Sequence, residues 1–204
     1  MEKWCPGLSW KYNLLVKRLF ELLSIPILVI PVSLIVIWLL VGTSSLSQRW
    51  FFIFFLNVVV LPLFSIVWLE RRRFVSDLDL KDKRERLAFL GLMVFVSAAN
   101  FINSLILSAP KIIQVLNLQL LILVAVMSIV TSFWKISGHM LVLTSLITTA
   151  YFIKGDAAFL LALILPLAAI HRLYFKHHTP LQVLAGLVCG FLIPALVVRF
   201  FGLN

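Results

Sequence analysis

The chain has 204 residues, of which 62% are hydrophobic and only 13% are charged, and its mean hydropathy is +1.10. Soluble domains are close to half apolar and a quarter charged, so this composition excludes an ordinary soluble protein and a disordered one. Two cysteines in the whole chain exclude a disulfide scaffold. The net charge of +10 does not indicate nucleic acid, because the basic residues lie between apolar segments, where they indicate membrane topology and anionic lipid headgroups.

The first 21 residues are mixed in polarity and predict an amphipathic helix. Polar residues, among them Asn13, Lys17 and Glu21, recur at a helical spacing, and leucines fill the opposite face. Such a helix lies on a membrane surface. The alternative is that this stretch is only the start of the first span. We therefore divide the chain into an interfacial segment, 1–21, and a transmembrane domain, 22–204.

Apolar segments follow, each close to the length of about 20 residues that crosses the hydrocarbon core of a bilayer. They predict an all-α transmembrane bundle of six to seven spans, since the fifth and sixth segments are short. The segments are approximately 22–42, 50–69, 87–108, 112–134, 137–153, 157–175 and 181–201.

The lysines and arginines predict the orientation of the bundle. With the N-terminus in the cytoplasm, only four of the 18 basic residues, Arg49, Lys111, Lys154 and Arg199, lie on the outer side. Basic residues favour the cytoplasmic side, so the N-terminus is expected inside and the C-terminus outside.

Polar residues gather in three clusters at span ends, at 77–86, 135–139 and 171–182. Two spans separate each cluster from the next, so all three are expected on one face of the membrane. All four histidines of the chain fall within the last two clusters. Paired histidines that share a face with arginines favour a functional site over a topology signal alone.

Each cluster also has a structural interpretation. Basic residues beside a span usually set topology, and Ser137 is a suitable helix N-cap. Thr179, Pro180 and Gln182 match a capping box, with the threonine as N-cap, the proline at the first helical position and the glutamine at the third.

The residue types suit phosphoryl transfer. Lysine and arginine bind a phosphate dianion, and arginine can hold two of its oxygens at once. A helix that begins at Ser137-Gly138 offers backbone N–H groups and a positive dipole end to an anion. Two histidines can divide the remaining work, one as the nucleophile and one as the acid for the leaving oxygen.

Two motifs resemble those of the type 2 phosphatidic acid phosphatase superfamily. Ser137-Gly138-His139 resembles the core of its P-S-G-H motif, and Arg172, followed after five residues by His178, resembles its R-x5-H-x3-D motif. The resemblance implies a transmembrane helix bundle and a lipid phosphatase that uses no metal or cofactor. It further implies that His178 attacks phosphorus, that His139 protonates the leaving oxygen, and that Arg172, Ser137 and the Gly138 backbone bind the phosphate.

The first motif of the superfamily has a counterpart at residues 82–86, which resemble a D-R-K-E-R variant found in divergent, often prokaryotic, members. The resemblance then covers roughly residues 77–190. It implies that Lys83 and Arg86 bind phosphate, and Arg84 could replace either of them.

Some positions depart from the superfamily pattern. Leu87 and Ile136 replace prolines, and Gln182 replaces the aspartate that follows the second catalytic histidine. Such an aspartate fixes the tautomer of the histidine and stabilises its charged form. A glutamine carbonyl can fix the tautomer but has no charge, so Gln182 is expected either to orient His178 or to serve only the helix cap.

These observations leave three functions open. The first is an integral, multi-pass lipid-phosphate or polyprenyl-diphosphate phosphatase with a phosphohistidine intermediate, in a prokaryotic cell membrane with its site on the cytoplasmic side. The second is a non-catalytic membrane protein that binds or carries anionic lipid. The third is a prenyl or phosphatidyl transferase, which would need a metal and is favoured only by Asp77, Asp79 and Asp82.

Overall fold

The computed structural model describes residues 35–36, 38, 45–75, 82–176 and 178–202. Every regular element in this part of the chain is a helix, which confirms the all-α class. The interfacial helix expected at 1–21 lies outside the described residues, and so does almost all of the first apolar segment.

The described helices follow the predicted segments to within a few residues. Those that are both long and apolar enough to cross a membrane number three, α5, α6 and α9, in the described part of the chain. The elements are α3 (Ser45–Phe55), the π-helical turn η1 (Leu56–Val60), α4 (Leu61–Arg71), α5 (Lys83–Ile106), α6 (Lys111–Thr131), α7 (Gly138–Lys154), the 3-10 helix η2 (Gly155–Leu163), α8 (Ile164–Tyr174) and α9 (Pro180–Phe200).

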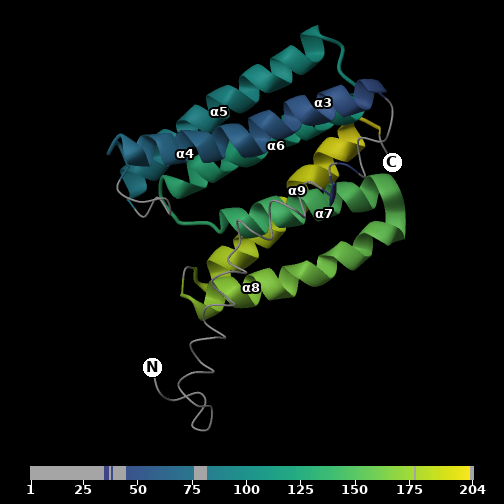
Figure 1. Ribbon diagram of the computed structural model, residues 1–204. Helices are drawn as coiled ribbons and strands as arrows, with labels where there is room; N and C mark the ends of the chain where they lie inside the picture. The colour runs from purple at the N-terminus through teal and green to yellow at the C-terminus, as the bar shows by residue number, and fades with distance from the viewer. Residues whose placement is uncertain (1–34, 37, 39–44, 76–81, 177, 203–204) are drawn as a thin grey trace, which may run out of the picture.

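The helices α3 and α4 lie in line with each other (Figure 1), joined by the π-helical turn η1. The second residue after the turn is Pro62, which has no N–H and therefore cannot bond to the carbonyl four residues earlier. One side chain also bonds to the backbone in this stretch, where the Asn57 amide donates to the Ile53 carbonyl at 2.9 Å. The chain from Ser45 to Arg71 thus remains helical despite the proline.

The helix α7 is the centre of the described bundle. All of its residues from Leu143 to Ala150 are buried, as are Met140 and Leu141. The helix packs against α6, α8, η2 and α9, and its leucines share one apolar core with residues of α3, α6, α8 and α9. The start of α7 is therefore held in place by helices on several sides.

Two glycines let α9 approach α7 closely. A β-carbon at Gly186 would lie 2.7 Å from the carbonyl oxygen of Ser137, and one at Gly190 would lie 2.6 Å from that of Leu141. The two glycines are four residues apart, the small-residue spacing by which membrane helices bring their backbones together. No other pair of elements in the described chain packs as extensively as α7 and α9.

Polar side chains also connect α6 with α7 inside the apolar core. The buried Gln119 amide donates to the Ser145 hydroxyl, and its oxygen accepts from the Thr149 hydroxyl at 2.8 Å. Both groups of the amide are therefore satisfied across the interface. Because unpaired polar groups are costly in an apolar interior, these bonds fix the register of α6 against α7.

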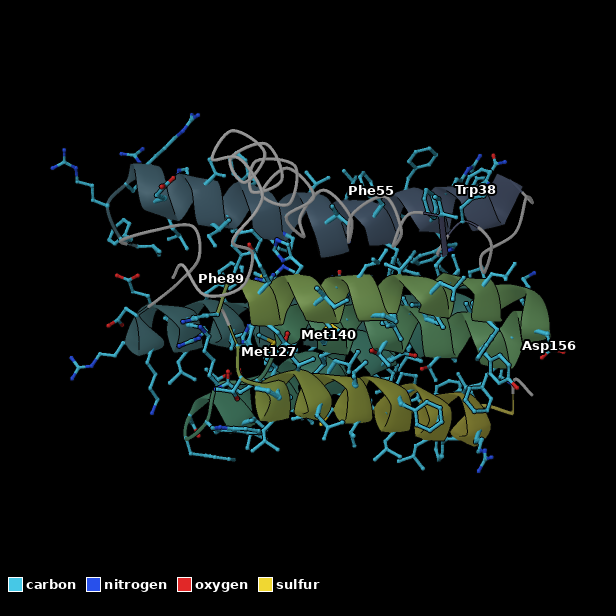
Figure 2. All side chains as sticks on the ribbon, turned by 90° about the horizontal axis from the view of Figure 1, so that it is seen from below. Trp38, Phe55, Phe89, Met127, Met140 and Asp156 are labelled. Carbon is cyan, nitrogen blue, oxygen red and sulfur yellow. The ribbon has the colours of Figure 1, made fainter. Side chains whose placement is uncertain are left out.

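One end of the bundle holds the starts of α5, α7 and α9 and the ends of α4, α6 and α8 (Figure 1). We call this the site end. In Figure 2, seen from below, Phe89 and Met127 lie toward it, whereas Asp156 marks the opposite end. The described residues of all three polar clusters therefore lie at one end of the bundle, as the count of spans between them predicts.

The close packing predicts that alanine at Gly186 or Gly190 destabilises the protein. The added methyl group must push α9 from α7, at a cost of about 1–3 kcal/mol typical of overpacking. Thermal unfolding in detergent measures the effect. Gly91 of α5 is the matched control, because it is exposed and no atom lies within 4 Å of its β-carbon position. Gly91→Ala should preserve or raise stability by up to about 1 kcal/mol. Equal stability of the Gly190→Ala and Gly91→Ala proteins would contradict the account.

Candidate functional site

The first turn of α7 and the last turn of α8 meet at His139 and Arg172. The guanidinium nitrogen Nη2 of Arg172 contacts Nδ1 of the His139 ring. Arg172 is buried, with 9% of its surface exposed. A buried guanidinium requires hydrogen-bond acceptors or an anion, so this arginine is held where an anion would be bound strongly.

The other predicted histidine, His178, lies just before α9. Its Nδ1 is 3.2 Å from the side-chain oxygen of Gln182, and the same oxygen accepts from the backbone N–H of Thr179 at 3.1 Å. The Thr179 hydroxyl in turn accepts from the Gln182 N–H, which completes the capping box that the sequence predicts. The two expected roles of Gln182 are thus not alternatives, because one oxygen makes both contacts.

These bonds determine the tautomers of both neutral histidines. Only the oxygen of the Gln182 amide can accept from the Thr179 N–H, and that oxygen can only accept from His178, so His178 Nδ1 carries the proton. Arginine is a donor only, so His139 Nδ1 accepts and its proton lies on Nε2. His178 therefore has a lone pair on Nε2, whereas the Nε2 of His139 carries a hydrogen.

Backbone bonds connect the two histidine pairs into a closed ring. The His178 N–H is 3.4 Å from the Arg172 carbonyl oxygen, and the Ser137 N–H donates to the Gln182 carbonyl oxygen at 3.2 Å. Ser137 then leads through Gly138 to His139, which returns to Arg172. Residues from the starts of α7 and α9 and the end of α8 are consequently held together by hydrogen bonds as one unit.

Ser137 is the N-cap residue of α7, but its side chain makes no capping bond. It is fully buried, and its hydroxyl has no hydrogen-bond partner among the described residues. The first N–H groups of a helix have no acceptor within the helix, and they point beyond its N-terminus. A buried hydroxyl without a partner beside these groups forms a cradle suited to an anion.

A pocket of about 540 Å³ opens at the site end. His178 and Gln182 lie in its wall, whereas Ser137, His139 and Arg172 do not. The remaining lining residues are Lys135, Leu173, Lys176, Thr179 and Pro180. His178 therefore lines an open pocket, whereas Ser137 and Arg172 are buried.

The first turn of α5 lies at the same end but does not line this pocket. Asp82 caps α5, accepting from the backbone N–H groups of Arg84 at 2.7 Å and Glu85 at 3.2 Å. Lys83 is exposed, and Nε of Arg86 is buried without a hydrogen-bond partner in the described chain. The predicted phosphate-binding roles of Lys83 and Arg86 therefore stay predictions.

Two lysines in the pocket wall, Lys135 and Lys176, are absent from the predicted site residues. In the sequence, only their positions indicate a place at the site, because Lys135 precedes Ser137 by two residues and Lys176 precedes His178 by two. Lys176 has a backbone φ of 54°, in the left-handed region that non-glycine residues seldom adopt. His177 lies outside the described residues.

In comparisons with protein-family models, with curated proteins and with solved structures, nothing significantly matches this chain. The site is therefore interpreted from its own geometry and from the short motifs in the sequence.

The hydrogen bonds predict opposite tautomers for the two histidines. In nitrogen-15 NMR spectra of the neutral rings, His178 should show a protonated Nδ1 and His139 a protonated Nε2. Gln182→Met removes the acceptor and should release His178 to a mixture of tautomers, whereas Thr179→Ala removes only a capping hydroxyl and should leave the tautomer unchanged. An Nε2-protonated His178 in the unaltered protein would show that Gln182 does not orient it.

Proposed function

We propose that this protein is a multi-pass membrane phosphatase that removes phosphate from a lipid phosphate or polyprenyl diphosphate through a phosphohistidine. On this proposal the 204 residues form six to seven spans and an interfacial helix at 1–21, and the site end faces the cytoplasm of a prokaryotic cell. The three long apolar helices and the excess of basic residues near the site end support this arrangement.

The single observation that favours catalysis over binding is the contact between Nδ1 of His178 and the side-chain oxygen of Gln182. A neutral ring that donates from Nδ1 to Gln182 carries its lone pair on Nε2, and this ring lines an open pocket. A site that only binds an anion needs donors such as Lys135 and Lys176, and a histidine lone pair would repel the anion. A fixed lone pair is instead what a nucleophile requires.

In the first step, Nε2 of His178 attacks phosphorus and the bond between phosphorus and the lipid oxygen breaks. His139 gives a proton to that leaving oxygen, so the lipid departs as an alcohol or a monophosphate. In the second step, water attacks the phosphorus of phosphohistidine while His139 takes its proton. The P–N bond then breaks, inorganic phosphate leaves, and the lone pair returns to His178. No metal takes part in either step.

Arg172 links substrate binding to the state of His139. Without substrate, its guanidinium donates to Nδ1 of His139. A phosphate dianion is a stronger acceptor than a neutral imidazole, so it draws the guanidinium away. Nδ1 of His139 can then take up a proton, and the charged ring can give a proton to the leaving oxygen. The Ser137 hydroxyl and the first N–H groups of α7 complete the binding of phosphate, with Lys83 and Arg86 of α5 as further donors.

One observation favours the second candidate, a protein that binds or carries anionic lipid without catalysis. Gln182 is neutral, so it cannot stabilise positive charge on His178 as the aspartate of the superfamily motif would. Such a protein would bind lipid phosphates through Lys135 and Lys176 and would release no phosphate from them.

Purified protein is expected to release phosphate from at least one member of a panel of lipid phosphates, including phosphatidic acid, phosphatidylglycerophosphate and a polyprenyl diphosphate, and EDTA should not abolish the release. His178→Ala should lower turnover by about 10⁴-fold or more, since it removes the nucleophile. His177→Ala is the matched control and should retain most of the activity, because His177 lies outside the five-residue spacing from Arg172. Equal losses in the two variants would refute the assignment of the nucleophile. Binding of these lipids without release by the unaltered protein would instead establish the second candidate.

Gln182→Glu should raise turnover about fivefold. Glutamate preserves an acceptor for His178 and for the Thr179 N–H, and its charge strengthens the bond to a positively charged histidine by about 1 kcal/mol. Initial rates at saturating substrate measure the change. A large loss would mean that charge at position 182 harms the site, contrary to the role given to Gln182.

A further inference from the structure

Five helices of the described chain are followed by a residue with positive φ, and the chemistry of these residues differs between the two ends of the bundle. Arg73 and Lys176 follow α4 and α8 at the site end, with φ of 59° and 54°. Ser108, Gly155 and Gly202 follow α5, α7 and α9 at the opposite end, with φ of 49°, 70° and 61°. Cations thus occupy this unfavourable position only at the site end of the described chain.

The end of α4 is a Schellman motif with arginine where glycine is usual. The Arg73 N–H donates to the Glu70 carbonyl and the Phe74 N–H to the Leu69 carbonyl, both at 2.9 Å. The ring of Phe74 stacks on that of Trp68, with centroids 6.4 Å apart, which is the apolar contact that accompanies the motif. A β-carbon at the left-handed position strains the backbone, so glycine would form this turn at a lower free-energy cost than arginine. The arginine therefore needs an explanation other than the turn itself.

The same turn carries three exposed arginines and two exposed aromatic rings. Arg71, Arg72 and Arg73 are all exposed, and the Arg72 guanidinium lies 5.7 Å from the centroid of the Trp68 ring. Trp68 and Phe74 are themselves 46% and 68% exposed. Cations and exposed aromatic rings at the end of an apolar helix are typical of residues at the boundary between lipid and water, and α4 ends in this way.

We propose that Trp68 and Arg71–Phe74 form a binding site for the headgroups of anionic phospholipids in the leaflet at the site end. The three guanidinium groups complement the phosphate charge, and Glu70 is the one acidic residue within the turn. The exposed rings favour a lipid over a free anion, because they would lie among acyl chains just below the headgroups. This site is separate from the proposed phosphatase pocket and does not depend on catalysis.

The opposite end of α5 supplies a matched control. Ser108 N–H donates to the Leu105 carbonyl and Ala109 N–H to the Ser104 carbonyl, which is the same motif with no charge at the left-handed position. Arg73→Gly and Ser108→Gly therefore relieve the same backbone strain, and only the first removes a cation. Both variants should be at least as stable as the unaltered protein.

The test measures quenching of tryptophan fluorescence in the full chain, reconstituted in phosphatidylcholine vesicles that contain brominated phosphatidylglycerol or brominated phosphatidylcholine. The contribution of Trp68 is obtained by subtracting the signal of a Trp68→Phe variant. The unaltered protein should prefer the anionic quencher, and this preference should fall at high salt. Arg73→Gly should lower the preference about fivefold, as should Arg72→Gln, and Ser108→Gly should leave it unchanged.

Equal quenching of the unaltered protein by the two lipids would overturn the proposal. An unchanged preference in both arginine variants, or an equal loss in Ser108→Gly, would overturn it as well. Phosphate release is not part of the readout, so an inactive protein that retains the preference would refute only the proposed phosphatase function.

Discussion

Where α9 crosses α7, Gly186 and Gly190 bring the two backbones so close that no side chain fits between them. The position of His178 and Gln182 relative to Ser137 depends on this contact. It places the start of α9 beside the start of α7, so that the Ser137 N–H reaches the carbonyl of Gln182. In a membrane the hydrophobic effect does not drive helices together, so close packing of small residues and internal hydrogen bonds have to hold the site in place.

The closed set of hydrogen bonds at the site end determines the protonation of the two histidines. A neutral histidine can carry its proton on either ring nitrogen, and its hydrogen-bond partners determine which nitrogen is protonated. Here one partner can only donate and the other can only accept. Arg172 makes His139 an acceptor at Nδ1, and Gln182 makes His178 a donor at Nδ1. Nε2 of His139 therefore carries a hydrogen, and Nε2 of His178 carries a lone pair. The proposed mechanism requires this difference, because His139 acts as the acid and His178 as the nucleophile.

Much of this arrangement is predictable from the sequence, and the rest is not, for physical reasons. Counting spans predicts that the three polar clusters share an end, and the order Thr179, Pro180, Gln182 predicts the capping box, because both depend on local spacing. The contact between Arg172 and His139 depends on how α8 packs against α7, which no local pattern specifies. The sequence does not predict that the Gln182 oxygen both orients His178 and caps α9, because on the sequence alone these roles exclude each other. The structure shows that one oxygen atom makes both contacts.

The most direct test of the phosphohistidine mechanism is to identify the phosphorylated nitrogen. The protein is mixed with a phosphorus-32-labelled lipid substrate and quenched in alkali, which preserves phosphohistidine, and the modified residue and ring position are determined by mass spectrometry and phosphorus NMR. The tautomer held by Gln182 predicts phosphate on Nε2 of His178. Phosphate on Nδ1 of that ring, or on any other histidine, would contradict the mechanism, as would phosphate release at full rate by the His178→Ala protein.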